Sequence, residues 1–116
     1  MGNHYRFQLV VHNGKEESME ASTTVASLVL HMDEWARYFI DENGDSPGLE
    51  EGDWECMATM REVSRLFPSW RIILYTDDDC ANDHQVHYFV NGAYYWDDAE
   101  LVYPEFDPER LERGAL

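Results

Sequence analysis

The chain is short of basic residues, cysteine and long apolar runs. Its 116 residues contain 8 Lys and Arg against 24 Asp and Glu, which gives a formal net charge of −16. A small domain usually carries a net charge of magnitude about 2 to 8. So strong a negative field repels nucleic acid and anionic membranes, and neither is expected as a direct partner. It favours a basic protein or cations instead.

Cysteine is too scarce for a disulfide framework, because only Cys56 and Cys80 are present. A reducing cytoplasm suits such a chain. The N-terminus lacks a basic region followed by an apolar run, and no stretch approaches the roughly 18 apolar residues of a membrane span. We therefore expect a cytoplasmic protein.

Apolar residues are nevertheless plentiful, at 44% hydrophobic and 14% aromatic, so the chain is expected to fold. Its length suits a single domain over residues 1–116. Residues 4–12 alternate apolar side chains, which predicts a strand, and Asn13-Gly14 predicts a hairpin that returns over residues 15–21. Helical spacing from Val25 predicts a helix over residues 25–41, with Ser22, Thr23 or Thr24 as its N-cap.

The second half of the chain predicts another helix and three strands. Asp53 is a candidate N-cap for a helix that Pro68 ends, with a buried face of Met57, Met60, Val63, Ser64 and Phe67. Residues 70–76 predict a buried strand, and residues 86–90 and 93–96 predict a hairpin across Asn91-Gly92. Residues 100–103 are a further candidate strand, and residues 107–109 resemble a helix start.

The resulting order, ββααβββ, predicts an α+β fold. We expect an antiparallel sheet of about four to five strands with two helices packed on one face. Most of the other face is expected to meet water.

Residues 41–55 are rich in acid and raise the alternative of a calcium-binding module centred on Asp41, Asn43, Asp45 and Glu50 or Glu51. The pattern departs from an EF-hand at its sixth position, Ser46, and at its twelfth, Gly52. Turn chemistry explains the same residues as an interhelical loop.

Motifs for other chemistry are missing. Cys80, His84 and His87 invite a zinc assignment, but a separation of three places the two histidines on opposite faces of a strand. No nucleophile elbow and no glycine-rich phosphate loop is present. We expect no enzyme, no cofactor and no metal ligand.

Basic residues are absent from residues 72–109, whereas ten acidic residues lie there. Aromatic side chains are interleaved with them and are favoured as interface anchors, although bracing of the sheet explains them equally. Carboxylates at alternate strand positions stand ~6.6 Å apart and DNA carries a charge every ~3.4 Å of each strand, so such a surface can approximate a row of phosphates. The candidate partner-binding residues are Asp77, Asp78, Asp79, Asp83, Tyr94, Tyr95, Trp96, Asp97, Asp98, Glu100, Glu105 and Asp107.

In size, charge and runs such as YTDDDCANDH and YYWDDAE, the chain resembles the small acidic inhibitors that act as DNA mimics, a class that includes phage anti-restriction and anti-CRISPR proteins. The resemblance implies a non-enzymatic inhibitor of a basic nucleic-acid-handling protein, such as a nuclease or a CRISPR effector. The resemblance rests on size, charge and composition and matches no family motif, so it carries over no functional residue. An immunity protein that neutralises a basic nuclease toxin, and a domain adapted to high salt, remain alternatives. No oligomeric state is predicted.

Overall fold

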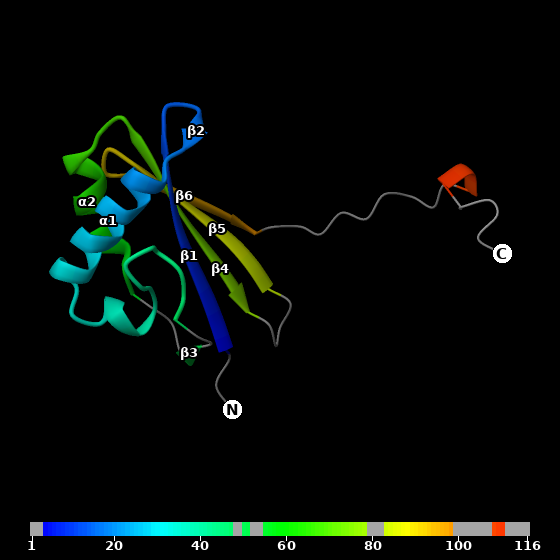
Figure 1. The fold of residues 1–116 in the computed structure, drawn as a ribbon, viewed down its shortest axis with the longest axis horizontal. Helices are drawn as coiled ribbons and strands as arrows, with labels where there is room; N and C mark the ends of the chain where they lie inside the picture. The colour runs from blue at the N-terminus through cyan, green and yellow to red at the C-terminus, as the bar shows by residue number, and fades with distance from the viewer. Residues whose placement is uncertain (1–3, 48–49, 52–54, 79–82, 99–107, 111–116) are drawn as a thin grey trace.

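The computed structural model describes residues 4–47, 50–51, 55–78, 83–98 and 108–110. These residues form six strands, two α-helices and two short 3-10 turns (Figure 1). The strands are β1 (His4–Asn13), β2 (Glu16–Glu17), β3 (Glu50–Glu51), β4 (Trp70–Asp78), β5 (Asp83–Val90) and β6 (Ala93–Asp98). The helices are α1 (Met19–Met32) and α2 (Met57–Leu66), and the 3-10 turns are η1 (Ala36–Tyr38) and η2 (Pro108–Arg110).

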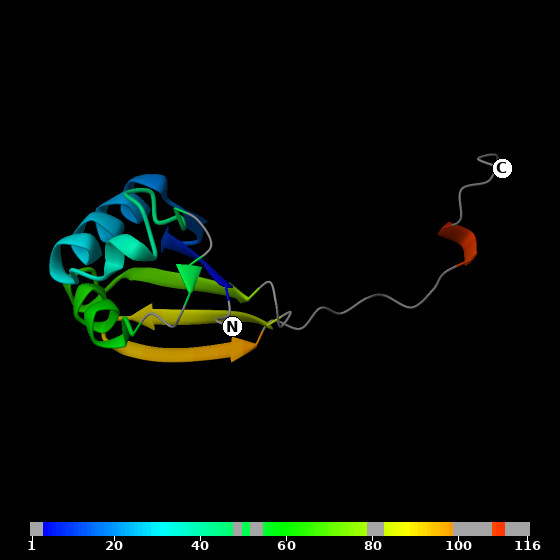
Figure 2. The ribbon, with the colours of Figure 1, turned by 90° about the horizontal axis from the view of Figure 1, so that it is seen from below.

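The strands form one antiparallel sheet in the order β2-β1-β4-β5-β6, and β3 also pairs with β1. Both helices pack on the same face of this sheet (Figure 2). The α+β fold expected from the sequence is therefore confirmed. The strands run on past the helices at the end where β1 begins (Figures 1 and 2).

The core lies between the helices and this face. Phe7, Leu9 and Val11 of β1 are buried, as their alternation predicts. They join buried residues of the other strands and of the helices in one cluster. Those residues include Ile72, Leu74, Phe89, Val25, Ala26, Val29, Met60 and Val63.

The outer edge of β1 is occupied along its length. β2 pairs with His12 and Asn13 at one end, and β3 pairs with His4 and Tyr5 at the other. Between them the backbone of residues 44–46 bonds to β1, with Leu9 N–H donating to Gly44 O at 2.7 Å and Ser46 N–H donating to Phe7 O at 2.9 Å. These three segments, together with Ser18 and Ser22, which bond to the backbone of Val11, satisfy the hydrogen-bonding groups of one sheet edge.

The first helix begins earlier than the sequence pattern predicts. Ser18 is its N-cap, and Ser18 Oγ accepts a hydrogen bond from Ala21 N–H at 3.1 Å. The predicted cap Ser22 is instead buried inside the helix, where its hydroxyl donates to Ser18 O and accepts from Val11 N–H at 2.8 Å. Thr23 and Thr24 donate to Glu20 O, which lets these β-branched residues remain helical. The predicted return strand over residues 15–21 is wrong, since β2 covers two residues only.

The first helix also ends earlier than residue 41. Its C-cap is Asp33 in an extended conformation, and Asp33 Oδ1 accepts a hydrogen bond from Trp35 N–H at 3.0 Å. This local side-chain bond stabilises a turn that competes with the helix. The apolar periodicity of the sequence continues past the end of the helix, because Ala36 in η1 and Ile40 just after η1 are both buried in the core. Trp35 is instead 62% exposed.

The second helix matches its predicted buried positions in part. Met60, Val63 and Ser64 are buried, but Met57 is 37% exposed and Phe67 is the half-buried C-cap, stacked on Trp70 with ring centroids 4.2 Å apart. The predicted cap Asp53 lies outside the described residues, and Cys56 precedes the first helical residue.

The second predicted hairpin forms with the predicted turn, whereas the first is a shorter hairpin with a shifted turn. Val90 pairs with Ala93, so Asn91 and Gly92 make the turn with positive φ angles of 46° and 81°. In the first hairpin Asn13 pairs with Glu16, which places Gly14 and Lys15 in the turn, one residue later than expected. Gly14 has φ +80°, as a turn with glycine at its first central position requires. Residues 100–103 lie outside the described part of the chain.

The face of the sheet opposite the helices, called here the open face, is less polar than expected. Val10 and Ile73 on this face are only 7% and 4% exposed, although no described helix covers them. The register places them in one row with Tyr88 and Tyr95. Neighbouring long side chains therefore shield the middle of the open face, while its margins meet water.

Candidate interaction surface at the acidic end of the sheet

Acidic residues from four strands meet at the end of the sheet that extends past the helices. Tyr5 of β1 pairs with Glu50 on one side and with Asp78 on the other, and Asp78 pairs with Asp83. In β6, Asp97 and Asp98 pair with Val86 and Gln85 near the start of β5. We call this set the acidic end. Its members are Glu50, Glu51, Asp77, Asp78, Asp83, Asp97 and Asp98.

The antiparallel topology explains this gathering. The first residues of β1 and β5 and the last residues of β4 and β6 lie at the same end, because each strand reverses the direction of its neighbour. Acidic runs that are far apart in the sequence thereby come to the same end of the sheet. Asp78 and Asp83 are direct neighbours on strands ~4.8 Å apart, whereas Tyr5 of β1 separates Asp78 from Glu50.

The sequence-predicted residues divide between the two faces of the sheet. Asp77, Tyr95 and Asp97 are on the open face, whereas Tyr94, Trp96 and Asp98 are on the face that carries the helices. The backbones of Asp78 and Asp83 form the last pair between β4 and β5, at the end of the sheet. Asp79, Glu100, Glu105 and Asp107 lie outside the described residues.

The three aromatic residues of β6 have different environments. Tyr94 is half-buried and packs on Phe89 with ring centroids 5.0 Å apart, so it braces the core. Tyr95 and Trp96 are 58% and 48% exposed. Tyr95 and Trp96 therefore border the acidic end as accessible aromatic side chains.

Glu50 and Glu51 belong to the acidic end but were not among the sequence-predicted partner-binding residues. Their strand is two residues long and pairs with β1, which is more than forty residues earlier in the chain. No periodicity can reveal so short a strand. The only signal in the sequence was the acidity of residues 41–55 as a whole.

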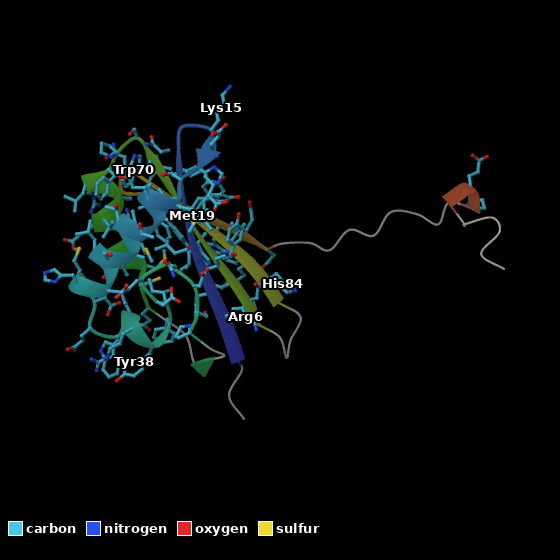
Figure 3. The ribbon with its side chains drawn as sticks, viewed as in Figure 1. Arg6, Lys15, Met19, Tyr38, Trp70 and His84 are labelled. Atoms are coloured by element: carbon cyan, nitrogen blue, oxygen red, sulfur yellow. The ribbon has the colours of Figure 1, made fainter. Side chains whose placement is uncertain are left out.

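Positive charge is sparse at the acidic end and more frequent elsewhere. Arg6 is exposed and pairs with Asp77 across the strands, and His84 Nδ1 lies 2.7 Å from Asp77 Oδ1. Figure 3 shows Arg6 and His84 at this end of the sheet and Lys15 and Trp70 at the other. The exposed Arg61, Arg65 and Arg71 lie on α2 and near the opposite end of β4. The charge of the sheet is thus polarised along the strands.

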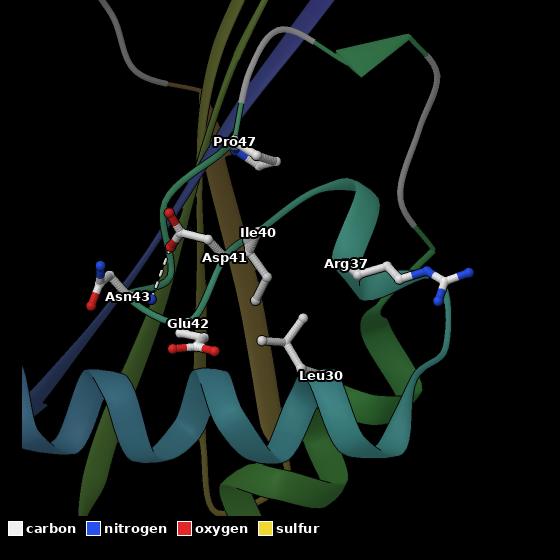
Figure 4. Close-up of a pocket in the computed structure, with 7 residues that line it drawn as sticks. All are labelled: Leu30, Arg37, Ile40, Asp41, Glu42, Asn43 and Pro47. Atoms are coloured by element: carbon white, nitrogen blue, oxygen red, sulfur yellow. Dashed lines mark hydrogen bonds between the residues drawn. The ribbon is translucent and has the colours of Figure 1, made fainter.

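The loop considered as a calcium site is organised by its own hydrogen bonds. Asp41 Oδ1 accepts from Asn43 N–H at 2.8 Å (Figure 4). It also accepts from Asp45 N–H at 3.1 Å. Beside it, Leu30 and Ile40 form the apolar part of an open hollow of about 470 Å³. The carboxylate of Asp41 therefore serves as the acceptor that shapes this turn.

His84 and His87 lie on opposite faces of β5, as strand alternation predicts. His84 contacts Asp77, whereas His87 Nδ1 lies 2.8 Å from the hydroxyl of Tyr94. Cys80 lies outside the described residues. Within the ranges that the structure describes, no group of three His, Cys, Asp or Glu side chains is placed to hold a metal ion.

Burial shifts the pKa values of three titratable groups on the helix side of the sheet, which are His87, Tyr94 and Cys56. It lowers the pKa of His87, whose ring is flanked by those of Tyr94 and Trp96 with centroids 6.0 Å and 6.2 Å away. Burial also raises the pKa of Tyr94, and it raises the pKa of the Cys56 thiol to about 12. A thiol with so high a pKa stays protonated at neutral pH and is a poor nucleophile.

Comparison of the chain with protein-family models, with curated proteins and with solved structures finds no match. The functional argument therefore depends on the residues of this chain. Neither described helix has the length and hydropathy needed to cross a bilayer.

Proposed function

We propose that this protein is a non-enzymatic inhibitor that binds a basic nucleic-acid-handling protein through the acidic end, in the cytoplasm of a bacterial cell. A nuclease or a CRISPR effector has the positively charged cleft that such a surface fits. The observation that supports the proposal is the strand register, which brings seven acidic residues from four strands to one end of the sheet.

The spacing of these residues suits a nucleic-acid cleft. The expected ladder at alternate positions of one strand is replaced by acidic positions spread across neighbouring strands, because Asp77 and Asp78, like Asp97 and Asp98, are consecutive in their strands. The directly paired positions Asp78 and Asp83 are ~4.8 Å apart, which is comparable with the ~3.4 Å between charges along each DNA strand. Glu50 is one strand further away, because Tyr5 of β1 lies between it and Asp78. A cleft built to hold phosphates can therefore face several carboxylates at once.

The physical basis of inhibition is competition for the cleft. The acidic end would displace the counterions of Lys and Arg side chains and occupy the channel that nucleic acid needs. The long-range field of a protein with net charge −16 would accelerate the encounter, and added salt would slow it.

The exposed aromatics favour one specific partner over a general adaptation to salt. Salt adaptation needs acidic surface but gives no reason to expose Tyr95 and Trp96 beside it. Aromatic side chains at the margin of a charged surface are typical anchors of protein interfaces. An immunity protein against a basic nuclease toxin would use the same surface, so both inhibitor classes fit.

Affinity capture with nucleic-acid competition tests the proposal. The full chain, immobilised, should retain basic nucleic-acid-binding proteins from a bacterial lysate, and duplex DNA should release them. A nuclease toxin captured alone would identify an immunity protein. Retention of neutral metabolic enzymes only, or of basic proteins that DNA does not release, would contradict the proposal.

A further inference from the structure

The two long edge strands of the sheet, β1 and β6, differ in whether other described segments pair with their outer edges. Three segments cover the outer edge of β1, whereas no strand of the described chain pairs with the outer edge of β6. An uncovered edge presents unpaired N–H and C=O groups and is a template for an added strand. β6 is also six residues long and carries Tyr95 and Trp96 exposed.

The register identifies the backbone groups that face outward. In a hairpin closed by two residues, the residues that flank the turn form a hydrogen-bonded pair, which here is Val90 and Ala93. Alternation along the ladder then directs Tyr95 and Asp97 toward β5. The N–H and C=O groups of Tyr94, Trp96 and Asp98 point to the open edge.

The side chains along β6 specify what a neighbouring strand should carry. Its first four residues, Ala93 to Trp96, are apolar or aromatic, and its last two, Asp97 and Asp98, are acidic. Tyr95 lies on the open face beside Tyr88, with ring centroids 4.8 Å apart, so the aromatic row of that face reaches the edge. Cross-strand pairs of like charge are unfavourable, and pairs of opposite charge are favourable.

We propose that the outer edge of β6 accepts an extended segment of the basic partner as an additional antiparallel or parallel strand. This segment carries apolar residues beside Tyr95 and Trp96, and Lys or Arg beside Asp97 and Asp98. The inference rests on the proposed function, since it takes the partner to be basic. A second copy of this chain is a poorer occupant, because two molecules of net charge −16 repel each other.

Strand addition has a signature that charge attraction lacks. The probe is a short synthetic peptide of alternating valine and threonine with two lysines at one end, added to the isotope-labelled full chain. With peptide at about ten times its Kd, amide hydrogen exchange at Trp96 and Asp98 should slow about tenfold. The inward amides of Tyr95 and Asp97, which are already paired with β5, should change little.

Two variants separate the backbone from the side chain at the edge. Trp96→Thr and Trp96→Pro both remove the indole, but only proline removes the outward N–H, a position where proline is tolerated in an edge strand. The proline variant should bind the peptide about three- to tenfold more weakly than the threonine variant. Equal affinities would overturn the proposal.

The remaining outcomes distinguish this inference from the proposed function. Binding of the lysine peptide without alternate amide protection would overturn strand addition and leave the acidic surface as the binding site. Equal binding of a peptide with two glutamates in place of the lysines would contradict both. Protection of Trp96 and Asp98 without peptide, increasing with protein concentration, would make a second copy the occupant and overturn the proposal.

Discussion

Ser64 joins the second helix to the hairpin that carries the exposed aromatics. Its side chain is fully buried, and its hydroxyl donates to Arg61 O at 2.7 Å and accepts from Gly92 N–H at 2.8 Å. The hydroxyl thus satisfies a backbone donor that the hairpin turn leaves inside the fold. Ser64 lies on the buried, otherwise apolar face of α2, and a hydroxyl group is needed there to accept the hydrogen bond of Gly92 N–H.

Ser64→Ala should lower the free energy of unfolding by about 1–3 kcal/mol, because Gly92 N–H would remain buried without its acceptor. Urea denaturation measures this loss. The control is Ser27→Ala in α1, where the serine is exposed, and its effect should stay within about 0.5 kcal/mol. Similar small effects of both substitutions would show that Ser64 does not stabilise the turn.

His87 should make stability depend on pH. Its folded pKa lies below the unfolded value of 6.5 because burial disfavours the charged ring. Between the folded and the unfolded pKa the unfolded chain therefore binds more protons than the folded chain. The contribution of His87 to the free energy of unfolding is fully present above about pH 6.5, and it is lost as the pH falls through the folded pKa. The neutral ring is also the form whose Nδ1 can accept from Tyr94.

The measurement compares the free energy of unfolding of the natural chain and of His87→Gln between pH 8 and pH 5. The difference between the two proteins should shift in favour of His87→Gln as the pH falls, whatever the acidic residues contribute to both. A constant difference would contradict the burial of a neutral His87.

Among elements, the segment of residues 44–46 depends on a glycine that lies against β1. Gly44 has φ +84°, and a Cβ added there would lie 2.7 Å from Leu9 O, a backbone atom that cannot move without disturbing the strand. Gly14 has a similar φ of +80°, but no atom lies within 4 Å of its added Cβ. The two positions share the same backbone requirement and differ in the space around it.

Gly14→Ala should therefore cost about 1 kcal/mol of stability, from the left-handed conformation alone. Gly44→Ala should cost at least about twice as much, because it adds the clash with Leu9 and loosens the covered edge of β1. Thermal or urea denaturation of both variants compares them directly. Equal losses would mean that residues 44–46 can leave β1 at little cost.

Elements with a strong local signal were predicted correctly from the sequence. The alternation in β1, the branched and aromatic run of β4 and the Asn91-Gly92 turn each determine their structure through neighbouring residues. The bounds of α1 were predicted wrongly, because the hydroxyl groups of Ser22, Thr23 and Thr24 fit a cap as well as a helix interior. β3 was missed because its pairing with β1 is entirely non-local.

For the molecule as a whole, the sequence predicted the strong negative charge but not its arrangement. Composition identified an acidic, aromatic stretch over residues 72–109. Only the strand register shows that its acidic residues in β4, β5 and β6 meet Glu50 and Glu51 at one end, and that Tyr94 turns inward while Tyr95 and Trp96 are accessible. Long-range pairing of strands has no counterpart in a local pattern, so this part of the candidate site could not be predicted.

The central claim is that the position of the acidic residues, beyond their number, determines binding. Substitution of Asp78, Asp97 and Asp98 by Lys changes three members of the acidic end. The matched control replaces three exposed glutamates by Lys. They are Glu16 and Glu17 of β2 and Glu62 of α2. Both triple variants raise the net charge from −16 to −10, because each of the three substitutions replaces −1 by +1.

The most direct test measures the affinity of both folded variants for the basic protein captured by the natural chain, at low and at physiological salt. Charges that face partner Lys or Arg contribute about 1.5 kcal/mol or more each, so reversal at the acidic end should weaken binding by about a hundredfold or more. The control should weaken it by about threefold or less, and chiefly at low salt. Equal losses in the two variants would contradict the claim and leave only diffuse attraction to the charge of the whole protein.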